Sequence, residues 1–337
     1  MPTIKDVAKQ VGVSTATVSH VINDTRFVSA ELKQRVLKAI QDLGYHPNAI
    51  ARSLVKRKTH TIGILISDIL NPFYTAIVRG IEDVTYKSGY SVMLCNTDED
   101  PEKEILYIQM LLEKRIDGLV ISTAFQDGIH PLLSRLKGIP LVTTVRKIRG
   151  LSSDAVLGDN RGGAYQAIDH LIRLGHRRIG IISGPTGLSS GAERLEGYKK
   201  ALEDHRIPME DQWVKIGDFK RESGYSLTKE MFQRDPLPTA LFVFNNQMAL
   251  GALQALNELK IRIPKDISFI SFDDMEWYSF LDPSLTAVEH SPYLIGKTAG
   301  EMLLQRIGKK RKNPKKVILP SHLIIRASTA RAAKERG

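Results

Sequence analysis

Eight short apolar segments, separated by amphipathic stretches, constrain the fold of this chain more than any other feature of its sequence. They predict strands at residues 62–66, 91–95, 117–122, 140–145, 179–183, 213–216, 240–245 and 267–272. Apolar residues recur with helical spacing between them, in the stretches 74–88, 103–114, 192–206, 222–234 and 247–260. The last four strands begin 117, 122, 123 and 127 residues after the first four. This near-constant offset predicts an α/β body made of two tandem lobes, each a doubly wound parallel sheet.

The first 45 residues have a different pattern, which predicts three short helices joined by tight turns. Thr3 and Asp6 fit a capping box, and Ser14 and Ser29 are suitable caps for the second and third helices. Glycine tolerates the left-handed conformation that ends many helices, so Gly12 and Gly44 are expected helix ends. The third helix carries an apolar stripe that we expect to face inward: Leu32, Val36, Leu37, Ile40 and Leu43.

Two helices joined by a three-residue turn that contains glycine form a helix-turn-helix, whose second helix enters the major groove of DNA. The predicted second helix, 15–23, has small hydroxylated residues on its outer face, which would let its backbone approach base edges closely. The alternative is a small helical bundle that binds no nucleic acid. We therefore predict an all-α head that binds DNA.

The chain carries a net charge of +11, and this charge is unevenly distributed. Residues 1–60 contain 10 Lys and Arg against 4 Asp and Glu, and residues 306–337 contain 11 against 1. The body between them contains 27 against 32 and is therefore slightly acidic. A cluster of basic residues in one module is typical of proteins that bind nucleic acid. For the basic C-terminal segment, a solvated end is an equal alternative.

These features lead to a specific resemblance. The segments IKDVAKQVGVSTATVSHVIN, RFVS and GYHPNAIARSL resemble the head of the LacI/GalR family of bacterial transcription regulators. The resemblance covers nearly the whole chain, with a purine-repressor-like head and a body similar to periplasmic binding proteins. It implies a sequence-specific regulator, expected to be a repressor, whose affinity for its operator is controlled by a small metabolite bound between two subdomains.

The resemblance also implies which residues contact DNA. Arg26 is chemically suited to bidentate reading of guanine. In the family, residues 47–60 form a hinge helix and linker, and Leu54 is a wedge inserted between bases in the minor groove; outside the family context, this residue would be an ordinary packed leucine. The full predicted DNA-binding set is Thr3, Ser14, Thr15, Ala16, Thr17, Ser19, His20, Asn23, Arg26, Asn48, Ala51, Leu54 and Val55.

In an open parallel sheet, ligands bind beyond the carboxyl ends of the strands. The residues that follow the predicted strands include aromatic rings, arginines, amides and a carboxylate, which can stack on an apolar ring face and bind hydroxyl, carboxylate or ring-nitrogen groups. The predicted effector-binding set is Asn71, Phe73, Tyr74, Arg146, Arg194, Phe219, Asn245, Asp273 and His290, the last at an expected crossover between the lobes. The alternatives are core packing for the aromatics, turn or cap roles for Asn245 and Asp273, and a surface position for Arg194.

Two positions depart from the family pattern. Val145-Arg146 stands where Asp-Arg is common, and Asn245-Asn246 stands where Asn-Asp is common. Both changes remove a carboxylate. They therefore raise the positive balance around the cleft, and an uncompensated pair of arginines favours a carboxylate or phosphate on the ligand. We expect a sugar acid or phosphorylated small metabolite rather than a plain hexose.

Other classes of protein are poorly supported. The turn SGPTGLSSG lacks the Gly-Lys-Ser/Thr ending of a phosphate-binding loop, and no catalytic or metal-binding motif is present, so we expect no enzyme activity, cofactor or metal. The single cysteine, Cys95, excludes an intramolecular disulfide and is expected to be buried. Without a secretory signal or an apolar run of 18 residues, we expect a cytoplasmic protein. The remote alternatives are a sugar-binding receptor and a nucleotide-dependent enzyme.

We predict three parts: a head at 1–46, a hinge and linker at 47–60, and an effector-binding and dimerisation domain at 61–337. The N-subdomain would comprise about 61–160 and 291–320, and the C-subdomain about 161–290 and 321–330. A homodimer would read a pseudo-palindromic operator, and the tail lacks the leucine heptads of a tetramer-forming coiled coil. Control by a protein partner or a purine-type corepressor remains an alternative, and the direction of the effector response is not encoded in any motif.

Overall fold

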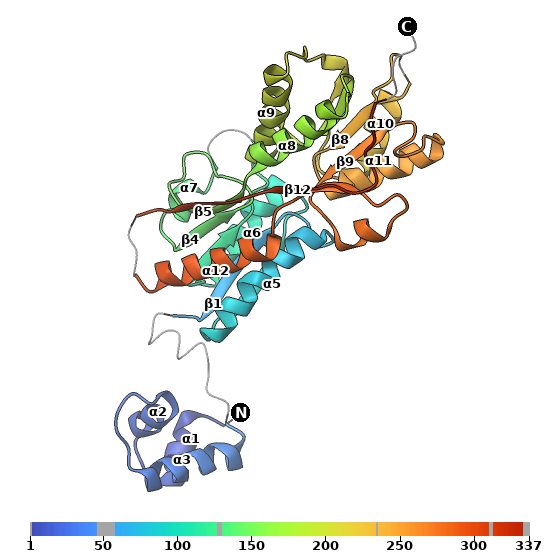
Figure 1. Cartoon of the computed structure of the whole chain (residues 1–337). Helices are drawn as coiled ribbons and strands as arrows, with labels where there is room; N and C mark the ends of the chain where they lie inside the picture. The colour runs from blue at the N-terminus through green and yellow to red at the C-terminus, as the bar shows by residue number, and fades with distance from the viewer. Residues whose placement is uncertain (1, 46–57, 127–129, 234, 310–312, 333–337) are drawn as a thin grey trace. The chain divides into compact units, whose positions relative to one another are not determined.

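The computed structural model describes residues 2–45, 58–126, 130–233, 235–309 and 313–332 (Figure 1). Contacts within the chain divide it into two compact units, Met1–Thr59 and His60–Gly337. Most of the predicted hinge and linker lies outside the described residues. Across the described ranges, no helix has both the length and the apolar composition that crossing a membrane requires.

The first unit contains the three predicted helices, α1 (Ile4–Val11), α2 (Thr15–Asn23) and α3 (Ala30–Leu43). The expected caps are confirmed. Thr3 and Asp6 form a capping box, Ser14 and Ser29 each accept a hydrogen bond from a backbone amide of the first turn, and Gly12 and Gly44 are left-handed. A small core holds the helices together and comprises Val7, Ala8, Val11, Val18, Val21, Val36 and Ala39.

One position of the predicted apolar stripe on α3 is wrong. Leu37 is 49% exposed, whereas Val36 is fully buried. Leu32, Ile40 and Leu43 pack at the edge of the core. Successive residues of a helix are about 100° apart, so a stripe aligned on Val36 directs the side chain of Leu37 away from the core.

The first lobe of the second unit is built on a parallel sheet of six described strands. Their spatial order is β11 (Lys316–Leu319), β5 (Asp154–Gly158), β4 (Leu141–Thr144), β3 (Gly118–Ile121), β1 (Thr61–Ile66) and β2 (Ser91–Asn96). Helices α5 (Pro72–Lys87) and α12 (Pro292–Ile307) pack together along one face (Figure 1). The other face is covered by α6 (Pro101–Glu113) and the short α7 (Leu133–Leu136). Cys95 is buried in that second layer, as expected.

The second lobe repeats this plan in its six described strands. Their order is β12 (His322–Ile324), β10 (Thr286–Glu289), β9 (Ser268–Phe272), β8 (Ala240–Val243), β6 (Ile179–Ser183) and β7 (Val214–Ile216). Helices α8 (Asn160–Arg173) and α9 (Ser189–Asp204) form one layer, and α10 (Arg221–Met231) and α11 (Asn246–Glu258) form the other (Figure 1). Short 3₁₀ turns, η1 (Asp211–Trp213) and η2 (Glu276–Phe280), complete the lobe.

The predicted internal repeat is confirmed as a repeat of topology. The positions of β1, β2, β3, β4 and β5 in the first sheet correspond to those of β6, β7, β8, β9 and β10 in the second. The final strands differ, because β11 is parallel to β5 whereas β12 is antiparallel to β10. The eight predicted strands are present, with ends shifted by at most two residues. The additional elements are β5, β10, β11, β12, α7, α8, α12 and the two 3₁₀ turns.

The chain passes between the lobes three times within the described residues, after β5, β10 and β11. The crossover expected near His290 is confirmed, since β10 ends at Glu289 in the second sheet and α12 begins at Pro292 on the first. Gly158, at the first crossover, lies against this histidine. A Cβ atom at Gly158 would lie 2.1 Å from His290 Nδ1, so only glycine allows the two crossover segments to approach this closely.

Candidate functional sites

The first candidate site is the outer face of the head. Thr15 and Ala16, at the start of α2, are exposed, and Thr17 is half-buried because its backbone amide and hydroxyl both contact Ser14 Oγ, at 3.1 and 2.9 Å. Arg26 is exposed and forms no hydrogen bond or ion pair with any described residue. These residues are therefore available to an external partner.

Other members of the predicted DNA-binding set have internal partners. Thr3 donates to Asp6 at 2.7 Å, and this bond, together with a second from the Thr3 backbone, lowers the pKa of Asp6. Asn23 donates to the Ser19 carbonyl at 2.9 Å, and His20 Nδ1 lies 2.8 Å from Thr25 Oγ1. The bonds of Thr3 fix the start of α1, and those of Asn23 and His20 fix side chains of α2 in the absence of a partner. Phe27, which the sequence analysis did not single out, is 97% exposed beside Arg26. Asn48, Ala51, Leu54 and Val55 lie outside the described residues.

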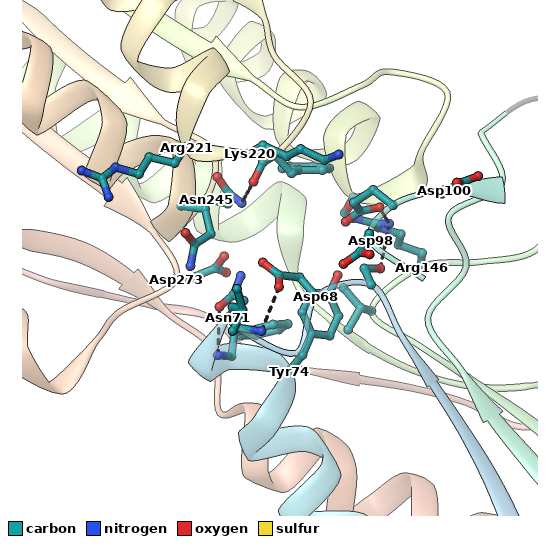
Figure 2. A pocket seen from close by; sticks show the side chains of 18 of the residues that line it. Asp68, Asn71, Tyr74, Asp98, Asp100, Arg146, Lys220, Arg221, Asn245 and Asp273 are labelled. Atoms are coloured by element: carbon teal, nitrogen blue, oxygen red, sulfur yellow. Dashed lines mark hydrogen bonds and ion pairs between the residues drawn. The ribbon is translucent and has the colours of Figure 1, made fainter. Parts of the chain in front are cut away.

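The second candidate site is a cleft of about 620 Å³ at the carboxyl ends of the strands, where the two lobes face each other (Figure 2). Eight of the nine predicted effector-binding residues line it: Asn71, Phe73, Tyr74, Arg146, Arg194, Phe219, Asn245 and Asp273. They come from both lobes, so a molecule in the cleft would contact both at once. Their side chains are buried.

His290 does not line the cleft but supports two residues that do. Its Nε2 lies 2.8 Å from Asp273 Oδ1, and its ring stacks on Phe73 with centroids 4.9 Å apart. Because it comes from the crossover between β10 and α12, it connects this crossover to the floor of the cleft. It therefore lies behind Asp273 and Phe73, next to the cleft but outside its lining.

Arg194 is buried in a network that fixes its guanidinium. Its Nε donates to Asn160 Oδ1 at 2.9 Å, a second nitrogen donates to the Phe244 carbonyl, and a third lies 3.5 Å from Asp273 Oδ1. The guanidinium carbon also lies 3.7 Å from the centre of the Phe272 ring, a cation–π contact. Burial alone would raise the pKa of Asp273, but the charge of Arg194 and the bond from His290 bring this pKa below its usual value. The pair is therefore ionised and electrically balanced.

Arg146 is also paired, which overturns the expectation that the cleft arginines are uncompensated. Glu99 binds it bidentately, with nitrogen-to-oxygen distances of 2.5 and 2.7 Å. Arg146 also donates to the Thr123 carbonyl at 2.9 Å, and it faces the Phe219 ring at 5.2 Å. Burial lowers the pKa of the guanidinium, but Glu99 outweighs this effect and the net pKa is raised. The argument for a carboxylate or phosphate on the ligand therefore loses its basis.

Several lining residues were missed by the sequence analysis, and most of them carry charge. They are Asp68, Asp98, Glu99, Asp100, Lys103, Ser190, Lys220, Arg221, Glu222 and Gln247, among others. The missed acids Asp98, Glu99 and Asp100 begin two residues after the end of β2 at Asn96. The rule that ligands bind beyond strand ends would have found them if it had been applied to that strand. In total the lining carries six carboxylates and five cationic side chains, so its charges nearly balance.

Backbone strain is concentrated at the cleft. In the described chain, eleven residues other than glycine have positive φ angles, and five of them line the cleft: Asp98, Glu99, Val145, Phe219 and Asp273. For Val145 this conformation is costly, because its β-branched side chain clashes with the backbone there. In this left-handed conformation, Arg146 N donates a hydrogen bond to the Thr144 carbonyl at 2.6 Å. Such strain is characteristic of functional sites, where surrounding packing holds residues in unfavourable conformations.

No group of three or more His, Cys, Asp or Glu side chains that could hold a metal ion occurs among the residues described. Instead, the cleft offers aromatic rings, paired charges and amides. Ser190 Oγ and Arg146 Nε are buried and have no hydrogen-bond partner within the described ranges. This arrangement is suited to reversible binding of a small polar molecule.

A capped helix-turn-helix joined to a two-lobed body with an interlobe cleft defines a DNA-binding regulator with a ligand-sensing domain. Residues 3–48 match the family described as bacterial regulatory proteins, lacI family, and residues 168–329 match the periplasmic binding protein-like domain. The HTH-type transcriptional repressor PurR of Haemophilus influenzae (strain PittEE) is 40% identical over 333 residues, covering 97% of this chain and 98% of that protein. PurR of Proteus mirabilis is 40% identical over 332 residues, covering 98% and 97%.

Solved structures agree with this assignment. The lac repressor dimer bound to operator and the anti-inducer ONPF is 29% identical, with a TM-score of 0.85, covering 98% of this chain and 99% of that one. The complex of the transcriptional regulator CelR with cellobiose is 31% identical, with a TM-score of 0.74, covering 97% and 100%. The chain belongs to the LacI family. It is a DNA-binding transcriptional regulator, not an enzyme.

Proposed function

We propose that the chain is a repressor that binds a pseudo-palindromic operator as a homodimer. Its affinity for the operator falls or rises when a neutral, polar small molecule occupies the cleft. The PurR proteins and the lac repressor named above are repressors, and the lac repressor was solved as a dimer on its operator. The inference that the ligand is neutral rests on the pairing of both cleft arginines, Arg146 with Glu99 and Arg194 with Asp273. A ligand with its own negative charge would have to compete with a carboxylate already in place.

The DNA-binding part of the proposal assigns roles within the head. Thr15, Ala16 and Thr17 approach base edges at the start of α2, Arg26 reads a guanine, and Leu54 of the linker is the minor-groove wedge. Thr3, Ser14 and Asn23 act mainly by fixing the helices through their internal bonds. Because its target is chromosomal DNA, the regulator acts in the cytoplasm.

The effector part assigns complementary roles in the cleft. The apolar face of the ligand packs against Phe73, Tyr74 and Phe219, and the Arg194–Asp273 pair offers a donor and an acceptor side by side, which suits hydroxyl groups. This favours a sugar, in line with the cellobiose held by the CelR relative. A planar purine-type molecule is the second candidate, because aromatic residues line the cleft and because PurR proteins are 40% identical to this chain.

Two experiments test the proposal. Selection of bound duplexes from a random pool, with and without metabolite extract, should recover one palindromic sequence whose enrichment changes with the extract. Calorimetry with neutral sugars, sugar phosphates, sugar acids and purine bases then identifies the ligand class. Binding confined to the phosphorylated or acidic members would overturn the neutral-ligand proposal, and enrichment of no sequence would overturn operator recognition. If the affinity for the operator changes only when a protein is added, the chain is a regulator controlled by a protein partner.

A further inference from the structure

The amino-terminal edge of the first sheet, opposite the cleft, is strongly basic. We define this basic edge by eight exposed cations that precede the strands or follow the helices there: Lys58, Lys87, Lys114, Arg115, Lys137, Lys309, Lys315 and Lys316. Within the described part of the chain, no ion pair neutralises the seven lysines. The edge belongs to a body whose residues 61–305 are acidic overall, so the positive charge is local.

The carboxylates at this edge do little to offset the charge. Asp154 is buried and bound bidentately by Arg306, at 2.9 and 3.0 Å, and it also accepts a bond from Lys315 N at 2.6 Å. Asp117 is half-buried and accepts a bond from His60 N at 2.9 Å. Among the described residues of the edge, only Glu113 is an exposed acid.

Stabilisation of helices explains only part of this pattern. Lys87, Lys114 and Lys309 lie at the carboxyl ends of α5, α6 and α12, where a cation interacts favourably with the helix dipole. Lys315 precedes the edge strand β11 and Lys316 begins it, so neither lysine has a helix end to stabilise. Lys137 and Lys309 line a groove of about 400 Å³ that also contains the Asp154–Arg306 pair and Pro314, and Lys315 and Lys316 directly follow Pro314 in the chain. Helix stabilisation therefore does not account for Lys315 and Lys316.

The position of the basic edge in the chain indicates which kind of partner it binds, because the segment that leads from the head ends there. Tyr45 is the last described residue of the head, and Lys58, which belongs to the basic edge, resumes the described chain just before β1. Figure 1 shows the start of β1 and the end of α12 at the same end of the first lobe. The 13 peptide steps between Tyr45 and Lys58 span at most about 45 Å when fully extended. The length of this segment therefore limits how far the head, and any DNA that it binds, can lie from Lys58.

The length of the basic edge is sufficient for contacts with several phosphates of a DNA duplex. Six strands spaced about 4.8 Å apart make an edge roughly 24 Å long. Duplex DNA carries one phosphate per about 1.7 Å of its axis, so about 14 phosphates lie along that length. We propose that the basic edge of the body is a second DNA contact, which binds the phosphate backbone without reading sequence and adds to the grip of the head. This goes beyond the operator and effector functions proposed above.

The test measures the salt dependence of binding to a 40-base-pair duplex of random sequence, using the full chain. The edge variant is K137Q/K315Q/K316Q, and the matched control is K199Q/K260Q/K265Q, three exposed lysines of the second lobe. Both variants lose the same net charge, so they differ only in where it is lost. Melting temperature and effector affinity are measured in both to confirm that they are folded.

Each phosphate contact contributes about 0.9 to the slope of log Kobs against log salt. The slope of the edge variant should therefore be less steep than that of the wild type by about 2 to 3, while the control slope stays within about 0.5 of the wild type. Equal slopes in the two variants would overturn the proposal and would instead direct attention to an acidic protein as the occupant. Because random-sequence DNA is used, failure of operator recognition by the head would not affect this result.

Discussion

Asn71 and Asn246 join the two lobes through a reciprocal pair of amide hydrogen bonds. Asn71 Nδ2 lies 3.0 Å from Asn246 Oδ1, and Asn246 Nδ2 lies 2.8 Å from Asn71 Oδ1. Asn71 caps α5 in the first lobe, and Asn246 begins α11 in the second. Both side chains are buried. The pair therefore closes the cleft from inside, and an asparagine at position 246 allows both bonds to form without burying a charge.

Asn246→Asp should weaken this closure. The carboxylate still accepts a bond from Asn71 Nδ2, but Asn71 Oδ1 then faces an acceptor instead of a donor. Asn71 Oδ1 keeps its bond from Phe73 N at 3.0 Å but loses the interlobe bond and faces a buried carboxylate oxygen. Loss of a buried hydrogen bond costs about 1–3 kcal/mol, which shifts the closed-to-open ratio by about 5- to 160-fold. Small-angle X-ray scattering of the ligand-free variant should show a larger radius of gyration. Asn257→Asp adds the same charge at an exposed position of α11 and should leave the radius unchanged; equal radii in all three proteins would contradict the interlobe role.

Glu99→Gln should convert the cleft to one that prefers anions. The substitution removes the carboxylate that neutralises Arg146 and leaves a buried cation available to a ligand. The ratio of affinities for glucose 6-phosphate and glucose, measured by calorimetry, should rise by about tenfold, equivalent to about 1.4 kcal/mol. The variant should also lose about 3–5 kcal/mol of unfolding free energy, as buried ion pairs do when one partner is removed.

The control for this change is Glu222→Gln, which removes an exposed carboxylate from the same cleft. Its affinity ratio should stay close to that of the wild type. If both variants shift the affinity ratio equally, the overall electrostatic potential of the cleft, and not the Glu99–Arg146 pair, determines the preference for anions.

The parts of the structure that could be predicted from the sequence are those set by local interactions. The caps at Thr3, Ser14 and Ser29 depend on residues three positions apart, so a short window contains the whole motif. The central strands of each sheet are buried on both faces and appear as continuous apolar runs, such as those of β1 and β6. Residues that directly follow such strands, including Arg146 and Asp273, could be assigned to the cleft for the same reason.

The features that could not be predicted depend on contacts between segments that are far apart in the sequence. Glu99 lies 47 residues from Arg146, and they pair only because β2 and β4 end at the same edge of one sheet. The sequence pattern around Arg146 therefore indicated a free charge where the fold provides a partner. Strands β11 and β12 were missed because they are short edge strands on the last crossover, and half-exposed edge strands lack a continuous apolar run.

Arg194→Ala should abolish the effector response and leave DNA binding by the head intact. The guanidinium binds Asn160 and Phe244 and balances Asp273, so its loss leaves a buried carboxylate without its cation. Titration of the effector identified by calorimetry should show no change in operator affinity, while affinity without effector stays near that of the wild type. Arg161→Ala, at an exposed arginine of α8, is the control. A retained response would place the effector elsewhere.

Arg26→Ala should relax base preference at one operator position. The side chain is exposed after the recognition helix α2, and a bidentate contact with guanine contributes about 1–3 kcal/mol of discrimination. Repeating the selection from a random pool with the variant should therefore recover the same palindrome with one position degenerate in each half. An unchanged preference at every position would remove Arg26 from the reading set.

His176 should make the second lobe less stable as the pH falls. Its Nε2 lies 3.0 Å from the Ala330 carbonyl and its Nδ1 lies 3.0 Å from Thr239 Oγ1, so it holds the C-terminal segment against the sheet. Burial lowers the pKa of His176 below its usual value of 6.5, and the bond to Ala330 offsets this only in part. The unfolded chain therefore takes up a proton at a pH where the folded protein does not, and stability that is complete above pH 6.5 is lost as the pH falls below it.

Burial also lowers the pKa of the nearby His170, which lies 3.0 Å from Thr329 on the same C-terminal segment, so the two histidines act in the same direction. Urea unfolding at pH 7.5, 6.5 and 5.5 should show a steeper decline of free energy for the wild type than for His176→Gln. The amide of glutamine can still donate to the Ala330 carbonyl but does not titrate. Parallel profiles for the two proteins would show that another group controls the acid sensitivity.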